Sequence, residues 1–171
     1  LDMAQMACHR IAERPYMFSG TFDGAGHTIG NIVLYNEAEP SYFGLVGALK
    51  GEGASVKNLT LVHPSVVSIF GWGVGSLVGL NEYGGMAKCH AVNADVAGLI
   101  ATGGLVGANT WYGKILGCSA TGTVSESPAG LFTNPNIGGL AGENSFYSEI
   151  ENSSARCDVS GSGGIGGLVG L

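Results

Sequence analysis

Five aromatic residues recur at a fixed distance from the leucines of a repeated phrase. Each stands six or seven positions after such a leucine: Tyr83, Trp111, Tyr112, Phe146 and Tyr147. If the repeats lie in register, the rings form a ladder along one edge. Rings that pack on one another would shield the core, and each pair contributes about 0.5–1.5 kcal/mol beyond burial. Rings that face solvent would form a platform for a ligand. We expect a structural ladder, with binding of a glycan or of a host or neighbouring-cell surface protein as the alternative.

Acidic residues are the second group that could do chemistry. Parallel β-helices also host polysaccharide lyases and hydrolases, which need clustered carboxylates or a Ca²⁺ site beside a basic residue. The aspartates do not occupy matching positions of neighbouring repeats: Asp2, Asp23, Asp95 and Asp158. Asp23 and Gly24 most simply form a turn, with His27 as a stacking or capping residue. The sequence therefore predicts no catalytic residue and no cofactor, and a carbohydrate-active enzyme is the alternative function.

The chain has 4 cysteines, an even number that disulfides would require. Cys89 and Cys118 occupy the same position of neighbouring repeats, so their side chains would run parallel, about 4.8 Å apart. That geometry suits a buried structural ladder of thiols better than a disulfide. No pair has the spacing of a zinc site, so we expect no metal.

The elements that position these residues follow from variants of Gly-Leu-Val-Gly. The phrase occurs around Leu45, Leu77, Leu105, Leu140 and Leu168, at steps of 32, 28, 35 and 28 residues. A period in this range is typical of a solenoid, in which each coil buries its apolar face against its neighbours. Crossovers between parallel strands are nearly always right-handed. We predict an all-β, right-handed parallel β-helix of about five coils over residues 18–171.

A second phrase predicts the strands and a corner. Apolar residues head its copies: Ile29, Val56, Met86, Ile115 and Ile150. Small or apolar residues then alternate with polar ones, which is the period of a strand. The parity slips between these two parts, and three copies have asparagine there: Asn31, Asn58 and Asn152. Asparagine tolerates a left-handed backbone, so we expect these three residues to line up as a structural ladder at a corner.

Composition narrows the classes of function. The chain has 171 residues, 31 of them glycine, and a net charge of −6. A basic surface for nucleic acid is absent, and no apolar run approaches the roughly 20 residues that span a bilayer. Residues 1–17 lie outside the repeats, where Asp2 could cap a short helix to about Glu13, with an irregular segment as the alternative. Because Leu171 falls inside a repeat, we expect a fragment whose targeting signals lie beyond it.

Two motifs resemble a known family. The segments 77–81 and 105–109 follow the Gly-Leu-Val-Gly-x-Asn phrase of the GLUG repeat, and residues 18–29 resemble the phrase that precedes such repeats in bacterial surface proteins. In that family the repeats occur in secreted or cell-surface adhesins and in non-catalytic regions of immunoglobulin-A-cleaving zinc peptidases. The resemblance implies an extracellular scaffold or adhesive role. It implies no peptidase activity here, because the His-Glu-x-x-His motif is absent. Self-assembly through the open ends of the solenoid is a further alternative.

Overall fold

The computed structural model describes residues 1–2, 10–12, 15–37, 41–127 and 134–170. These residues form nineteen strands and no helix. Within the same ranges, therefore, no helical segment is long and apolar enough to cross a membrane.

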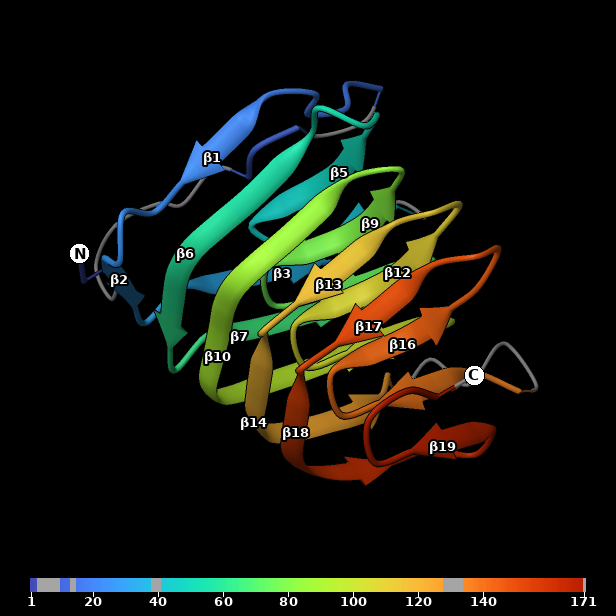
Figure 1. The fold of residues 1–171 in the computed structure, drawn as a ribbon. Coiled ribbons are helices and arrows are strands. Elements are labelled where there is room, and N and C mark those ends of the chain that lie inside the picture. Colours follow the sequence, from blue (N-terminus) through green and yellow to red (C-terminus); the bar gives the residue numbers. More distant parts are fainter. Residues whose placement is uncertain (3–9, 13–14, 38–40, 128–133, 171) are drawn as a thin grey trace.

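The strands form three parallel sheets, which Figure 1 shows as rungs stacked from the N-terminal coil to the C-terminal one. The ten-stranded sheet contains β1 (Thr21–Asp23), β2 (Thr28–Gly30), β3 (Val33–Asn36), β6 (Ser55–Val62), β7 (Ser65–Ser68), β10 (Gly85–Gly98), β13 (Lys114–Leu116), β14 (Ser119–Glu126), β17 (Glu149–Glu151) and β18 (Ser154–Ser160). The five-stranded sheet contains β4 (Tyr42–Phe43), β8 (Gly73–Gly75), β11 (Ala101–Gly103), β15 (Asn136–Gly138) and β19 (Gly164–Gly166). The four-stranded sheet contains β5 (Val46–Lys50), β9 (Val78–Glu82), β12 (Val106–Thr110) and β16 (Ala141–Asn144).

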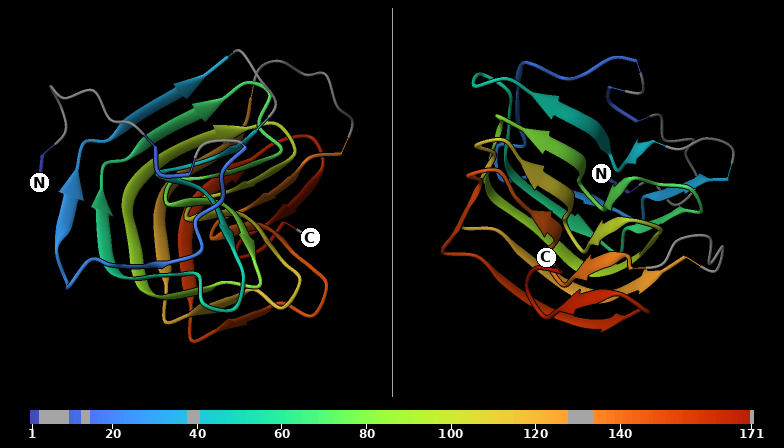
Figure 2. Two further views of the ribbon diagram at one scale, coloured as in Figure 1. Left: turned by 90° about the horizontal axis from the view of Figure 1, so that it is seen from above. Right: turned by 90° about the vertical axis from the view of Figure 1, so that its right-hand side faces the viewer.

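The architecture confirms the predicted parallel β-solenoid. Seen from above in Figure 2, the chain runs clockwise as it passes from the near N-terminal coil to the far C-terminal coil, which is a right-handed path. The five-stranded sheet has five rungs and the four-stranded sheet has four, close to the expected five coils. Strands of successive coils pair side by side in each sheet, so residues at one position of the repeat stack along the axis.

Two corners of the ten-stranded sheet have a left-handed backbone. Asn58 and Asn152 lie at the first corner, with φ of 55° and 50°, in one column with Lys88 and Gly117. Asn31 lies instead at the second corner, where His63 and Asn93 also have positive φ. The structure therefore corrects the predicted register of Asn31.

The correction has a physical cause in the first coil. Four residues separate Asp23 from Thr28, whereas two separate the paired residues Lys57 and Thr60. The two extra residues form the turn after Asp23, and they shift the register of the following residues relative to β6 by two positions. As a result Ile29 pairs with Leu61, and Phe22 takes the place opposite Val56 that the sequence had assigned to Ile29.

The glycines of the repeated phrase lie where the four-stranded and five-stranded sheets approach each other. A Cβ atom on Gly79 of β9 would lie 2.3 Å from the backbone nitrogen of Phe43 in β4. A Cβ atom on Gly107 of β12 would meet the nitrogen of Val74 at the same distance. Only glycine permits such an approach. The leucines of the same phrase, Leu77, Leu105 and Leu140, are fully buried in the core.

The N-terminal segment pairs with the first coil at three points. Asp2 bridges Gly30, Ile11 bridges Val46 and Phe18 bridges Leu49, each in parallel. The helix expected from Asp2 to about Glu13 falls mainly on residues 3–9 and 13–14, which lie outside the described residues. Ile11, a described residue within the expected helix, forms a β-bridge and is not helical.

Candidate functional site

Two turns that leave the four-stranded sheet carry consecutive aromatic residues in the left-handed conformation. Trp111 and Tyr112 have φ of 49° and 62°, and Phe146 and Tyr147 have φ of 52° and 64°. The backbone nitrogen of Gly113 donates to the carbonyl of Thr110 at 3.1 Å and closes the first turn. Turns of this kind favour asparagine and glycine. A left-handed backbone costs other residues about 1–2 kcal/mol each, so the aromatic rings occupy strained positions.

The aromatic residues form two stacks. Trp111 packs on Phe146 with ring centroids 4.5 Å apart and an interplanar angle of 2°. Tyr112 packs on Tyr83 at 6.0 Å and on Tyr147 at 5.3 Å. The ring of Tyr83 therefore joins the tyrosine stack, although its offset from Leu77 predicts a place above Trp111.

The length of one turn explains this change of partner. Glu82 pairs with Thr110, and Gly85 pairs with Lys114. Two residues connect the strands in the upper coil, and three connect them in the lower coil. Tyr83 is consequently placed beside Tyr112, so equal sequence offsets do not give equal positions in space.

These rings are partly exposed. Trp111 exposes 43% of its surface and Phe146 exposes 52%, even though their faces cover each other. The expected structural ladder is present as ring stacking, but it does not close over the core. We call this ridge of Tyr83, Trp111, Tyr112, Phe146 and Tyr147 the aromatic edge.

A ladder of three asparagines, of which Asn81 and Asn109 are buried and Asn144 is half-buried, holds the aromatic edge in place. Asn81 Nδ2 donates to Asn109 Oδ1 at 2.7 Å, and Asn109 Nδ2 donates to Asn144 Oδ1 at 2.8 Å. Each amide also donates to a backbone carbonyl of its own turn, at 3.0–3.1 Å: Gly84, Gly113 and Ser148. The ladder ties each turn to the next coil. These residues stand four positions after the repeat leucines, and that constant offset is the sequence signal that could have identified them.

The asparagine ladder has an upper end. Leu49 occupies the matching position of the coil above Asn81. Leucine offers no donor, and Asn81 Oδ1 is a buried acceptor without a hydrogen bond. An unpaired buried polar group costs about 1–3 kcal/mol, so the first coil joins the stack less favourably than the coils below it.

A groove runs along one side of the aromatic edge, with a volume of about 490 Å³. Leu80 and Ala108 line it on the four-stranded sheet. Trp111 and Phe146 line it on the aromatic edge. The remaining lining residues include Tyr42 of β4, and Trp72 and Ile100, which directly precede β8 and β11 of the five-stranded sheet. Glu82, Thr110 and Glu143 contribute the polar groups. A volume in this range is typical of ligand sites.

The carboxylates of this groove are held by neighbours. Glu82 Oε1 lies 3.0 Å from Lys50 Nζ. Glu143 Oε1 accepts a hydrogen bond from Ser145 Oγ at 2.5 Å. Tyr42 and Trp72 meet edge to face, with centroids 6.1 Å apart and planes at 72°. The groove therefore combines rings in different orientations with oriented hydrogen-bond acceptors.

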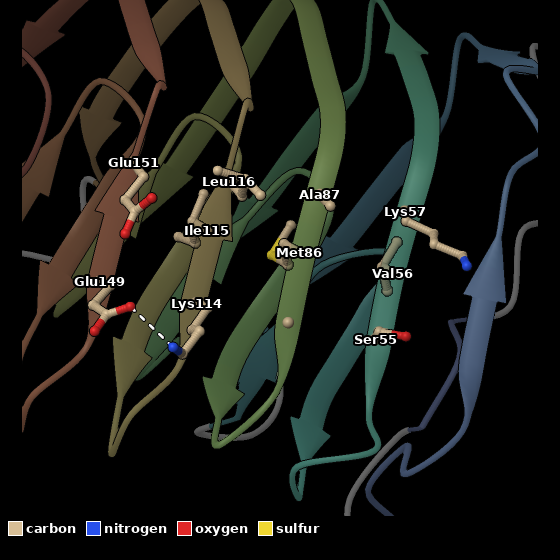
Figure 3. Close-up of a pocket in the computed structure, with 11 residues that line it drawn as sticks. Ser55, Val56, Lys57, Met86, Ala87, Lys114, Ile115, Leu116, Glu149 and Glu151 are labelled. Carbon is tan, nitrogen blue, oxygen red and sulfur yellow. Dashed lines mark ion pairs between the residues drawn. The ribbon is translucent and has the colours of Figure 1, made fainter.

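Two further depressions lie away from this groove. The tyrosine side of the aromatic edge has one of about 430 Å³, lined by Tyr83, Tyr112 and Lys114 among others. Figure 3 shows the other, about 370 Å³, on the outer face of the ten-stranded sheet. Lys114 and Glu149 pair there at 3.1 Å on neighbouring strands, and Leu116 is the exposed apolar residue. This ion pair neutralises two of its charged groups, and its lining contains no aromatic ring.

The cysteines lie on neighbouring rungs of the ten-stranded sheet. Cys89 and Cys118 are free, buried thiols, and the backbone nitrogen of Cys89 donates to Cys118 Sγ at 3.4 Å. The hydrogen bond with Cys118, together with burial, raises the pKa of Cys89. Cys157 is a free, half-buried thiol whose pKa is raised by burial. Cys8 lies outside the described residues.

Asp23 and His27 lie in the extra turn of the first coil. Asp23 Oδ1 accepts hydrogen bonds from Asn58 Nδ2 and from the backbone nitrogen of Ala25, both at 2.9 Å. The bond from Asn58 is the main reason that the pKa of Asp23 is lowered. The backbone nitrogen of His27 donates to the Gly24 carbonyl. Among the residues that the structure describes, no three His, Cys, Asp or Glu side chains gather as a metal site would require.

Comparison with known proteins agrees with this geometry. Residues 98–125 and 133–160 match the GLUG motif, which confirms the repeat identified in the sequence. Over 94 residues the chain is 38% identical to halomucin of Haloquadratum walsbyi (strain DSM 16790 / HBSQ001), a match that covers 54% of this chain and 1% of halomucin.

A solved structure shares the fold. The crystal structure of a proposed immunoglobulin A1 protease from Bacteroides ovatus matches with a TM-score of 0.61 and 20% identity, over 98% of this chain and 61% of that one. The chain thus spans less than two thirds of either relative. At this identity the likeness concerns the fold alone.

Proposed function

We propose that this chain is a non-catalytic scaffold and adhesion module of a secreted or surface-attached protein. The observation that carries the proposal is one pair of rings of the aromatic edge: Trp111 and Phe146 stand in left-handed positions on two neighbouring coils, line the groove and remain partly exposed. Strained residues of this kind concentrate at functional sites. A solenoid supports such a role because its stacked coils present one extended surface.

The comparisons support the extracellular part of the proposal. The GLUG motif and the resemblance of residues 18–29 to bacterial surface proteins agree with a scaffold or adhesive role. A match of 94 residues that makes up 1% of halomucin agrees with a module inside a very long protein.

Adhesion can be tested with coated microspheres. The 171-residue chain is coupled to spheres that flow over a mucin-coated surface and over the same mucin after chemical removal of its glycans. We expect retention on the mucin surface well above that of bare spheres. The double variant Trp111→Asn/Phe146→Asn should lose retention, because asparagine suits the left-handed turn but lacks the ring.

The microsphere assay has a matched control variant and two results that would contradict the proposal. Tyr147→Asn changes the same turn on its other side and should retain the spheres. Retention of wild-type spheres no better than bare spheres on both surfaces would remove the adhesion proposal. Release of reducing ends from a bound polysaccharide would overturn its non-catalytic part and favour an enzyme.

Self-association is a second candidate because the last coil exposes apolar residues that are buried in the coil above. Ile165 is 45% exposed, whereas its partner Ile137 is fully buried. Leu168 is 38% exposed, and Leu140, the repeat leucine of the coil above, is fully buried. Such an end can pair with a second copy. Sedimentation velocity over a hundredfold concentration range should then show dimers that the variant Leu168→Lys abolishes, and a monomer throughout would exclude the idea.

A further inference from the structure

The groove beside the aromatic edge is longer than one coil. A second depression of about 290 Å³ adjoins it and shares Tyr42 and Trp72 with it. This second part reaches Ala48 in the first coil, and the main groove reaches Glu143 three rungs below. The combined surface follows the solenoid axis, which suits a linear ligand better than a compact one.

The backbone of the four-stranded sheet is not available to that ligand. Strand β12 pairs with both β9 and β16, and β9 also pairs with β5. An extended peptide gains affinity mainly by adding main-chain hydrogen bonds to a free sheet edge. Over these rungs it would find no edge, and its amides would lie against Leu80, Ala108 and aromatic rings. Burying amides without partners is unfavourable.

A sugar chain meets the same surface without that penalty. The C–H faces of a pyranose ring are apolar and pack on aromatic and aliphatic groups, and its hydroxyl groups point outward around the ring. Thr110, Glu82 and Glu143 offer hydroxyl and carboxylate groups for those hydroxyls. Trp111 adds an indole N–H donor, and Trp72 adds a ring from a different lining segment.

The charges of the groove select among sugars. The charged groups that line the main groove are acidic. Glu82 is paired with Lys50 at 3.0 Å, Glu143 has no ion pair among the described residues, and the whole chain has a net charge of −6. Like charges brought into a shared site repel each other. Uronic acids and sulfated or sialylated glycans are therefore disfavoured relative to uncharged ones.

We infer that the groove between the aromatic edge and the entry to the five-stranded sheet binds a linear, uncharged polysaccharide that lies along the solenoid axis. Trp72 and Trp111 contact it from different lining segments, and Glu82 and Glu143 hold its hydroxyl groups. The inference rests on the proposed adhesion function and names its ligand class.

The chain offers a direct probe of this site. Its two tryptophans, Trp72 and Trp111, both line the groove. Intrinsic tryptophan fluorescence is measured while cellohexaose, mannohexaose or chitohexaose is added, with a hexagalacturonate as the anionic comparison and calorimetry as the second readout. We expect at least one uncharged hexasaccharide to shift the emission with saturation and to bind at least tenfold more tightly than the hexagalacturonate.

Matched variants locate the binding. Trp111→Asn and Trp72→Leu should each weaken calorimetric affinity at least tenfold. Tyr147→Asn stands in the same turn as Phe146 but does not line the groove, and its affinity should stay within twofold of wild type. Circular dichroism and the melting temperature of each variant separate loss of the site from loss of the fold.

Two results overturn the inference. One is the absence of a fluorescence or calorimetric response to all three uncharged hexasaccharides up to about 1 mM. The other is binding that folded Trp111→Asn and Trp72→Leu proteins retain. If no hexasaccharide binds but coated spheres are still retained on the deglycosylated mucin, the polysaccharide inference is wrong and adhesion to a protein ligand still holds. The two experiments therefore distinguish failure of the inference from failure of the adhesion proposal.

Discussion

Trp111 and Phe146 stack almost perfectly parallel, with centroids 4.5 Å apart, on backbones that are both left-handed. The stacking of one pair contributes about 0.5–1.5 kcal/mol, and the two left-handed conformations oppose folding by about 1–2 kcal/mol each. Stacking alone does not offset this strain. Burial and the hydrogen bonds of the asparagine ladder must supply the remaining stabilisation. The aromatic rings therefore occupy positions whose backbone conformation favours glycine.

The first prediction separates strain from stacking. Both Trp111→Gly and Trp111→Ala remove the ring, but alanine keeps the left-handed strain and glycine does not. We expect the alanine variant to be less stable than the glycine variant by about 0.5–1 kcal/mol in urea unfolding. Equal stabilities would mean that the turn abandons its left-handed conformation once the ring is gone.

The second prediction concerns the asparagine ladder. Asn109→Ala removes the donor to Asn144 and leaves the Gly113 carbonyl without a side-chain partner. We expect a loss of about 2–4 kcal/mol in the free energy of unfolding, since each unsatisfied buried group costs about 1–3 kcal/mol. Asn152→Gly, at an exposed left-handed corner, is the control and should change stability by about 0.5 kcal/mol or less. Similar losses in both variants would contradict a special role for the ladder.

The third prediction tests core packing. Ala120 is fully buried, and a Cβ added to Gly104 would lie only 2.9 Å from the Ala120 Cβ. Ala120→Leu should therefore destabilise the protein by about 1–3 kcal/mol through overpacking, as measured by chemical denaturation. Thr123→Val on the exposed side of the same strand should stay within about 0.5 kcal/mol of wild type. If Ala120→Leu leaves the free energy of unfolding unchanged, the interior of the coil can accommodate the larger side chain and the overpacking argument is wrong.

The fourth prediction concerns pH. Hydrogen bonds from Asn58 and Ala25 lower the pKa of Asp23, so the ionised form is favoured in the folded state. A lowered folded-state pKa stabilises the protein above the unfolded value of about 3.9, and that contribution disappears as pH falls through the folded value. NMR titration should show the Asp23 pKa rising in Asn58→Gly. Lys57→Met should raise it less, because the ion pair is a smaller cause than the Asn58 bond. The reverse order would refute this assignment.

The fifth prediction concerns thiol reactivity. Burial and the hydrogen bond with Cys118 keep Cys89 protonated, and both thiols are covered by the coil. In native protein, iodoacetamide should modify Cys157 slowly and leave Cys89 and Cys118 unmodified, with sites assigned by mass spectrometry. All should react in urea. Rapid native modification of Cys118 would show that the coils open locally.

The periodic features of the fold could be predicted from the sequence because every coil repeats the same constraint. The spacing of Leu77, Leu105 and Leu140 defines the coils, and all three leucines are buried. The matched positions of Cys89 and Cys118 are likewise neighbours on adjacent rungs. Features that recur at one offset within coils of equal length can be predicted from the sequence alone.

Features that depend on turn length could not be predicted. Asn31 resembles Asn58 in type, but the two extra residues after Asp23 move it to another corner. Tyr83 changes stack because its turn is one residue shorter. The groove residues Tyr42 and Trp72 stand at different offsets from the repeat leucines Leu45 and Leu77, so no common offset reveals that both line the groove with Trp111.

The asparagine ladder has a direction, and this bears on how such proteins lengthen. Each rung donates to the following one, and the step from Asn81 to Asn109 is 28 residues. A duplicated unit of that length, inserted at this step, receives a hydrogen bond from the rung before it and supplies one to the rung after it. A partial duplication misplaces the amide and interrupts the series. Growth by whole units therefore requires little adaptation, and gene duplication can extend the reach of the protein by about 4.8 Å per coil.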